Sequence, residues 1–232
     1  MISCKKSDSP ITKVTPVDLD SITANYYEQY LKLYPLDATA QGDERYNDQL
    51  PINIDKDFIS GEITFYNSVQ NQLKKVDYKS LSDQDKTVYD VLDYTLKDKI
   101  ERYAYHPEYI PFTQFSGLPL DFPLLGSGQG NQPFKTEKDY SDWLKRTENF
   151  PAWMDAAIEN FREGITNQYV LPKKLVVKMV TQMNAEEITS SDFSKNIFYG
   201  PINNFPKNFT AAQREKFTNE FKTMITKRII PS

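Results

Sequence analysis

A series of segments in which apolar residues recur every three or four positions constrains the fold of this chain most strongly. This spacing puts apolar side chains on one face of an α-helix. It predicts helices at about 16–34, 56–76 and 151–166, and others that start at Ser82, Thr136, Pro172 and Thr210. No alternating, strand-like pattern runs for more than four residues. The sequence therefore predicts an all-α fold.

The sequence indicates where most of these helices start, because a side-chain oxygen precedes them and can accept a hydrogen bond from the first free backbone amides. Such oxygens precede the predicted helices at Thr15, Asp55, Ser82, Thr136 and Thr210. The residues expected to face inward from the later helices are Val88, Leu92, Leu96, Tyr140, Trp143, Leu144, Met154, Ile158, Phe161, Ile165, Leu175, Val176, Met179, Val180, Met183, Phe217, Phe221, Met224 and Ile225.

The helical pattern fails between Tyr105 and Pro133, where four prolines and four glycines interrupt it. A long ordered loop or a pair of extended segments is expected there, and residues 189–209 form a second irregular stretch. The first stretch is rich in apolar residues, including Phe112, Phe115 and Phe122. It is either a wall of a peptide-binding cleft, built from these aromatic residues, or a cover packed across the helices.

Two rare residue types exclude much chemistry. The chain has one His, His106, and one Cys, Cys4, so it cannot supply the three or four His and Cys ligands of an ordinary zinc site. Only His106 could serve a catalytic triad or dyad, and its place at a helix exit favours a capping role. A net charge of −4 offers no general attraction for nucleic acid. Asp and Glu residues are plentiful, but the spacing of these residues in the sequence does not single out two that could act as a catalytic acid and base.

The glycine-rich run at 126–130 superficially resembles a phosphate-binding loop. It lacks the preceding strand and the Gly-Lys-Ser/Thr ending that such loops use, so a turn is the simpler interpretation. No cofactor is expected to bind to this chain by itself.

The first residues, Met1-Ile2-Ser3-Cys4, resemble the end of a bacterial lipoprotein signal, in which the Cys becomes lipidated. The charged and apolar regions of a signal peptide do not precede them. Either a signal was trimmed, or Cys4 is an ordinary thiol. We expect residues 1–14 to be a tether, residues 15–232 to form the helical domain, and the protein to reside in the cell envelope, lipid-anchored to a bacterial membrane or periplasmic.

The order of several short segments resembles the bacterial domain of unknown function 885 family. These segments are Tyr34-Pro35-Leu36-Asp37-Ala38-Thr39, Gly42-Asp43, Arg45-Tyr46, Tyr89-Asp90-Val91-Leu92, Leu118-Pro119-Leu120-Asp121-Phe122-Pro123, Gln132-Pro133-Phe134, Asp139-Tyr140, Trp143-Leu144, Gly164, Pro172, Val176-Val177 and Phe198-Tyr199-Gly200-Pro201. The resemblance implies a helical, zinc-metallopeptidase-like protein that is exported or lipid-anchored. The zinc would be held by a HExxPGHxxQ-type motif that these 232 residues do not contain, so no catalytic or metal-binding residue is carried over.

Three hypotheses follow. The chain is the N-terminal portion of such a protein, inactive alone, which supplies a substrate-channel wall for a peptide and pairs with a missing C-terminal half. Alternatively, it is a self-sufficient helical module that binds a peptide or partner. The third hypothesis is a stand-alone hydrolase that uses two carboxylates. Under the first, we expect Phe217, Phe221 and Ile225 of the last helix to be less completely packed than Val88, Leu92 and Leu96.

Overall fold

The chain folds into helices joined by short turns, as the computed structural model describes it for residues 18–232. The α-helices are α1 (Leu19–Leu33), α2 (Pro35–Ala40), α3 (Lys56–Leu73), α4 (Asp83–Glu101), α5 (Leu118–Gly126), α6 (Glu137–Arg146), α7 (Phe150–Thr166), α8 (Lys173–Met183), α9 (Glu186–Thr189), α10 (Gly200–Asn203) and α11 (Ala211–Met224). Shorter helical turns are η1 (Glu44–Tyr46), η2 (Tyr78–Ser80), η3 (Arg102–Tyr105), η4 (Pro107–Tyr109), η5 (Thr147–Asn149), η6 (Ile197–Tyr199) and η7 (Ile225–Ile229). No strand occurs among these residues, so the predicted all-α class is confirmed.

The predicted helix starts within this range are confirmed by their hydrogen bonds. Asp55 accepts from the amide of Phe58 at 2.6 Å, and Ser82 accepts from that of Asp85 at 3.1 Å. Thr136 and Thr210 each head a reciprocal capping box. The predicted start at Thr15 lies outside the described residues, and α1 is capped by Asp18.

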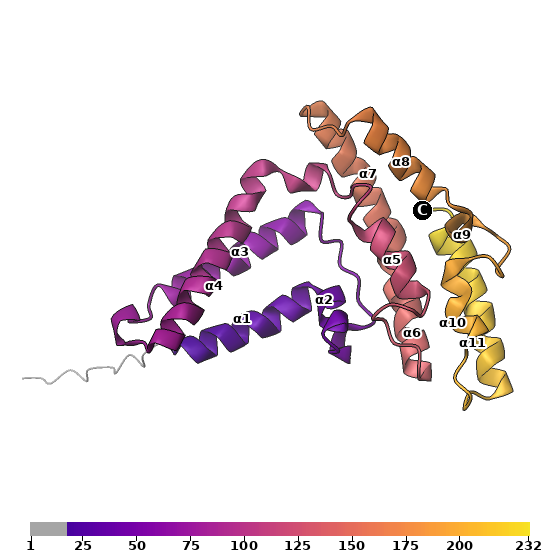
Figure 1. Ribbon diagram of the computed structural model, residues 1–232, viewed down its shortest axis with the longest axis horizontal. Coiled ribbons are helices and arrows are strands. Elements are labelled where there is room, and N and C mark those ends of the chain that lie inside the picture. The colour runs from indigo at the N-terminus through magenta and orange to yellow at the C-terminus, as the bar shows by residue number, and fades with distance from the viewer. Residues whose placement is uncertain (1–17) are drawn as a thin grey trace, which may run out of the picture.

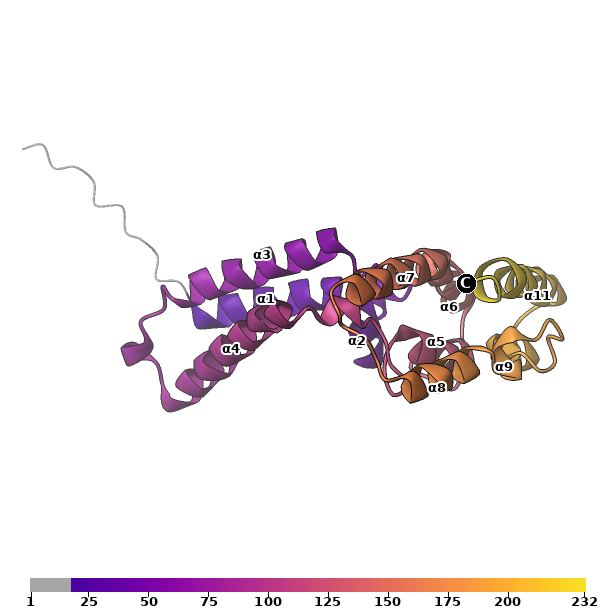
Figure 2. The ribbon, with the colours of Figure 1, turned by 90° about the horizontal axis from the view of Figure 1, so that it is seen from above.

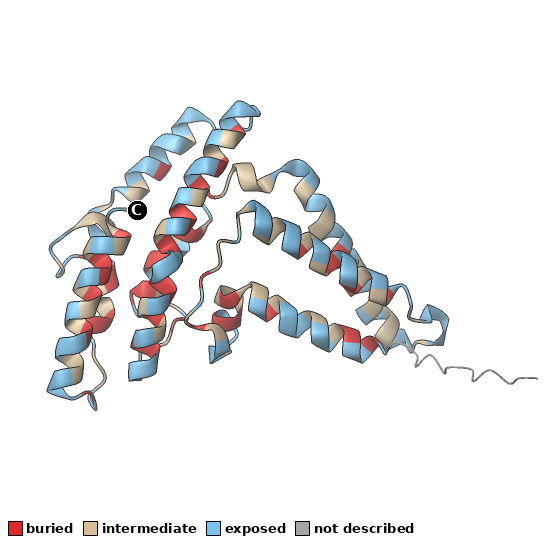
Figure 3. Cartoon of the chain, turned by 180° about the vertical axis from the view of Figure 1, so that it is seen from behind, coloured by how far each residue is buried: buried red, intermediate tan, exposed pale blue. Residues whose placement is uncertain are grey.

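The helices form two arms (Figures 1 and 2), and each arm has its own hydrophobic core. In the first arm, α1, α3 and α4 enclose a small cluster of Leu19, Ile22, Tyr66, Val69, Leu73, Leu92 and Leu96. In the second arm, a larger aromatic cluster centres on Phe122, Tyr140, Trp143, Phe198, Phe217 and Phe221. Figure 3 shows the buried residues gathered on the facing sides of these helices.

Arg146 at the end of α6 ties the segment between α1 and α3 to the second arm. Its side chain is fully buried. The guanidinium donates to neutral oxygens of Pro35 (3.5 Å), Thr39 (2.8 Å), Tyr46 (2.7 Å), Gln49 (3.0 Å) and Gln132 (2.5 Å). This bonding holds residues 35–49 against α6.

The prediction that residues 105–133 contain no helix was wrong, because α5 lies within them. Pro119 falls in the first helical turn, where a missing amide hydrogen costs little. Pro123 is interior, but its neighbour Phe122 stacks on Phe150 with ring centroids 4.6 Å apart. The packing of this short apolar helix offsets the lost hydrogen bond. The second predicted irregular stretch, 189–209, likewise contains η6 and α10.

The predicted inward faces of the helices at 151–166 and 172–184 were partly wrong. Ile158 and Ile165 of α7 are 43% and 65% exposed, because the buried stripe of α7 runs instead through Trp153, Met154, Ala157, Asn160 and Gly164. On α8 only Met179 is buried, and Val176 and Val180 face solvent. This outer helix packs through a narrower face than its sequence pattern indicates.

The expected looseness of the last helix was also wrong. Phe217, Phe221 and Ile225 are fully buried, whereas Val88 of α4 is 40% exposed. The reason is the position of α11 beside α6, where Phe217 and Phe221 pack around the ring of Tyr140 at centroid distances of 5.1 and 5.7 Å.

Candidate functional site

Three hollows open on residues 110–135, which overlap the segment from Tyr105 to Pro133 that the sequence singled out. A polar trough of about 820 Å³ lies beside residues 127–135. An apolar groove of about 410 Å³ includes Ile110 and Phe112. A cleft of about 310 Å³ includes Pro111, Gly117, Leu118 and Asp121. The segment is therefore a common wall for all three.

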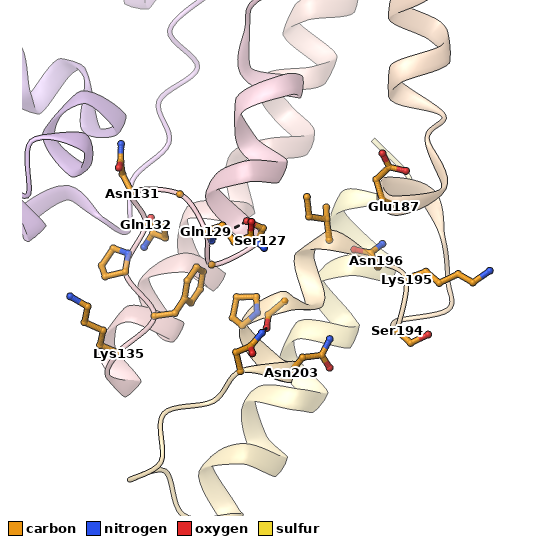
Figure 4. A pocket seen from close by; sticks show the side chains of 18 residues that line it. Ser127, Gln129, Asn131, Gln132, Lys135, Glu187, Ser194, Lys195, Asn196 and Asn203 are labelled. Atoms are coloured by element: carbon orange, nitrogen blue, oxygen red, sulfur yellow. Dashed lines mark hydrogen bonds between the residues drawn. The ribbon is translucent and has the colours of Figure 1, made fainter.

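The polar trough is the largest of them and has two facing walls (Figure 4). One wall is the turn and extended segment at 127–135, between α5 and α6. The other carries Glu187 of α9, residues 194–197 and the α10 residues Gly200, Pro201 and Asn203, followed by Asn204. The trough therefore joins two segments that lie about 70 positions apart in the chain.

Glycines let the two walls meet at the base of the trough. A Cβ atom on Gly200 would lie 2.2 Å from the carbonyl oxygen of Ser127. One on Gly126 would lie 2.4 Å from the ring of Phe198. The predicted turn follows, with Gly128 at a φ of 80° and the Ser127 hydroxyl accepting from the amide of Gln129 at 3.0 Å. Side chains larger than hydrogen at positions 126 and 200 would push the walls apart.

Side-chain amides dominate the polar groups of the trough. Asn196 is engaged, because its amide nitrogen donates to the carbonyls of Ile188 and Ser190. Gln129, Asn131 and Asn203 are exposed, and their side chains make no hydrogen bond to any other residue of 18–232. Each offers two donor hydrogens and an acceptor oxygen to a ligand.

Gln132 connects this trough to the Arg146 site. The side chain is 2% exposed, and its oxygen accepts from Arg146. Its amide nitrogen is buried and has no partner within the described part of the chain. The wall at 127–135 is thus anchored from behind by a buried cation.

The three aromatic residues predicted to form a substrate wall are not together. Phe112 is 8% exposed and lines the apolar groove, Phe115 is 85% exposed, and Phe122 is fully buried against Trp143 and Phe150. Their role in a substrate wall stays a prediction. The trough amides were not predicted, although the runs Gln129-Gly130-Asn131-Gln132 and Asn203-Asn204 were a visible signal. Cys4 lies outside the described residues.

The apolar groove lies between α7 and α8. Its walls are Ile110, Phe112, Phe161, Ile165, Tyr169, Val170, Leu171, Val176, Met179, Val180 and Met183. The neighbouring residues Lys173, Lys174 and Lys178 are exposed and form no ion pair within residues 18–232. The groove therefore has a hydrophobic lining, and the helix that forms one of its walls also carries three exposed lysines.

The zinc implied by the family resemblance has no ligand set in the described residues. No three His, Cys, Asp or Glu side chains of 18–232 come together in a way that could hold a metal ion. The ring of His106 instead bonds Glu108 at 2.9 Å and stacks on Tyr109, while its backbone caps η3. We therefore assign no step to a metal held by this part of the chain.

None of the helices in residues 18–232 is both long and apolar enough to cross a membrane.

Comparison with known proteins supports the family resemblance noted in the sequence. The family model described as "Bacterial protein of unknown function (DUF885)" matches residues 35–232, from α2 to the last residue. A search of the curated proteins gave no match. The matched region contains both walls of the trough, the groove and nearly all of the cleft. The chain belongs to the bacterial DUF885 family.

Proposed function

We propose that this chain is the N-terminal, substrate-facing portion of an exported, lipid-anchored, metallopeptidase-like protein, and that its trough forms one wall of a peptide channel. The unengaged amides of Gln129, Asn131 and Asn203 are the observation that carries this proposal. The peptidase character rests on the resemblance of the sequence to the family. Zinc and the catalytic groups would belong to a C-terminal half that pairs with this chain.

A peptide suits the trough for chemical reasons. A side-chain amide has the same donor and acceptor groups as a peptide bond, so it can pair with an extended backbone whatever the peptide's side chains are. The volume of about 820 Å³ lies within the range of ligand sites. Lys135, exposed and without an ion pair within residues 18–232, adds a positive charge for an acidic side chain.

The test is binding of hexapeptides blocked at both ends, followed by NMR of the side-chain amides. We expect Asn131→Ala with Asn203→Ala to weaken binding at least about tenfold, because two backbone-like partners are lost. The matched control is Asn71→Ala with Asn219→Ala, which removes exposed amides that do not line the trough. Equal affinity of the two double variants for every peptide would contradict the proposal.

The alternative is a self-sufficient helical module that binds a peptide or partner without catalysis. The apolar groove favours it, because contiguous apolar surface on a monomer often marks an interaction site. Under this alternative, Val180→Asp would abolish binding of the ligand or partner, and the trough variants would leave it unchanged.

The envelope location depends on Cys4. We propose that this residue is lipidated when it follows a complete signal, which would hold the protein at a membrane surface without burying it. The mass of the mature N-terminus tests this point. A free thiol at Cys4 would refute the anchor while leaving the trough untouched.

A further inference from the structure

The cleft between the two arms is separate from the trough. Its lining includes Leu33, Tyr34, Leu36, Asp37, Arg102 and Tyr103 from the first arm and its connections. Leu118, Asp121 and Trp153 come from the second arm, and Leu50, Asn53 and Ile54 come from the segment that joins α2 to α3. Any molecule bound here would touch both arms.

The floor of the cleft is apolar. Trp153, Leu50 and Leu118 are 3%, 4% and 8% exposed, so each is part of the folded core and presents only an edge to the cleft. Trp153 is fixed by its indole hydrogen bond to the side-chain oxygen of Asn53 at 2.9 Å. A cavity of about 310 Å³ has the volume of roughly ten liquid water molecules. That is the size of an amino acid or a small dipeptide.

Two opposite charges line this small cleft without partners. Asp121 accepts no hydrogen bond and forms no ion pair with any residue of 18–232. Burial alone raises the pKa of this carboxyl above its ordinary value. Arg102 likewise donates no side-chain hydrogen bond within this range and lies only near the ring of Tyr103. The two side chains form no ion pair with each other, so both charges remain available to a ligand.

We infer that this cleft binds a small zwitterion with an apolar side chain, a free amino acid or dipeptide, whose carboxylate pairs with Arg102 and whose ammonium group pairs with Asp121. A planar guanidinium can hold a carboxylate through two parallel hydrogen bonds. Asp121 is exposed at the edge of the cleft but partly desolvated there, so a cation would stabilise its charged form. The apolar side chain then contacts Trp153, Leu50 and Leu118. This inference does not depend on the proposed peptide channel.

Isothermal titration with four forms of leucyl-leucine tests the assignment of each charge. The forms are the free dipeptide, its N-acetyl derivative, its C-terminal amide and the doubly blocked molecule. We expect each single block to weaken binding at least about tenfold, because one charge-assisted pair is lost.

Variants then connect each end of the ligand to one residue. Arg102→Gln should weaken binding of the free dipeptide at least about tenfold but leave that of the amide unchanged, since the amide has no carboxylate to lose. Asp121→Asn should weaken the free dipeptide in the same way and leave the N-acetyl form unchanged. Arg162→Gln and Asp98→Asn, exposed residues outside the cleft, are the matched controls and should change nothing.

Two results would overturn the inference. One is equal binding of all four forms, or binding that neither variant changes. The other is a coupling between Arg102→Gln and Asp121→Asn in the stability of the ligand-free protein, which would mean that the two residues close on each other instead of on a ligand. The trough variants at Asn131 and Asn203 should leave dipeptide binding unchanged, so failure here and failure of the proposed function are distinguishable.

Discussion

Arg146 donates hydrogen bonds to five residues that lie far from it in the sequence. Burial lowers its pKa to about 10, opposed by the nearby carboxylates of Asp48 and Asp142, so the guanidinium stays charged at neutral pH. Its hydrogen-bond partners are backbone carbonyls, a hydroxyl and an amide, and none is a carboxylate. The positive charge is therefore stabilised by dipoles that five separate residues supply.

We predict that Arg146→Lys lowers the free energy of unfolding by about 3 kcal/mol, because an ammonium group cannot reach all of these acceptors and leaves several of them buried and unpaired. Urea denaturation measures the change. Arg45→Lys is the control, since that side chain is 52% exposed and its carboxylate partners can turn to water. A loss for Arg146→Lys no larger than that for Arg45→Lys would show that the buried site is not a structural centre.

At the scale of elements, the burial pattern reverses the expected order of stability between two helices. The inward residues Phe217 and Phe221 of α11 are surrounded by aromatic rings, whereas α4 buries only Leu92 and Leu96 in a smaller core. We predict that the amides of α11 open at a higher free energy than those of α4 in native-state hydrogen exchange. Greater protection in α4 would mean that the burial of side chains in the structure does not predict which of the two helices is more stable.

The sequence correctly predicted the features of the helices that depend on residues close together in the chain. The caps at Asp55, Ser82, Thr136 and Thr210 were found because each joins atoms three residues apart. The helix α5 was missed because a count of prolines ignores where each one falls in a turn. Pro119 is tolerated because it falls in the first turn, and Pro123 is tolerated because the packing of Phe122 offsets the hydrogen bond that it removes.

The candidate site was less predictable than the helices, for a similar reason. The sequence pointed to the segment between Tyr105 and Pro133 but placed its function on Phe112, Phe115 and Phe122, which lie in three different environments. Asn131 and Asn203 line the two walls of the trough, and Asp121 and Arg102 both line the cleft. Only the folded chain brings such distant residues to one surface, since neither pair has a spacing that a local pattern could reveal.

At the scale of the whole molecule, both cores contain tyrosines whose hydroxyls are buried. Tyr34, Tyr66 and Tyr103 donate to the buried carboxylate of Glu62 in the first arm. Burial, followed by these bonds to Glu62, raises the pKa of each of the three. In the second arm, Tyr140 donates to the carbonyl of Pro201 at 2.9 Å, and burial raises its pKa to about 12.

These shifts predict that stability falls in alkali. A tyrosine with a raised pKa in the folded state keeps its proton while the unfolded chain releases its own, so its stabilising contribution is complete below about pH 10 and is lost as the pH rises from there through about 12. Urea midpoints measured from pH 8 to pH 11.5, with phenolate absorbance as the second signal, check this. A constant midpoint over that range would show that the buried hydroxyls titrate normally.

The bonds of Arg146 also have a consequence for the order of folding during synthesis. The first arm relies on contacts among α1, α3 and α4, all made by residues before 102, so it can form while the chain is still being translated. The acceptors at Pro35, Thr39, Tyr46 and Gln49, however, wait for a donor that is 97 to 111 residues further along. Until the ribosome has released α6, the carbonyl of Gln49 lacks this donor, whereas the carbonyls of Pro35 and Tyr46 already accept from the Thr39 hydroxyl and the Gln49 amide. We therefore expect the bonds between Arg146 and residues 35–49 to form after the first arm, because they join positions that lie 97 to 111 residues apart.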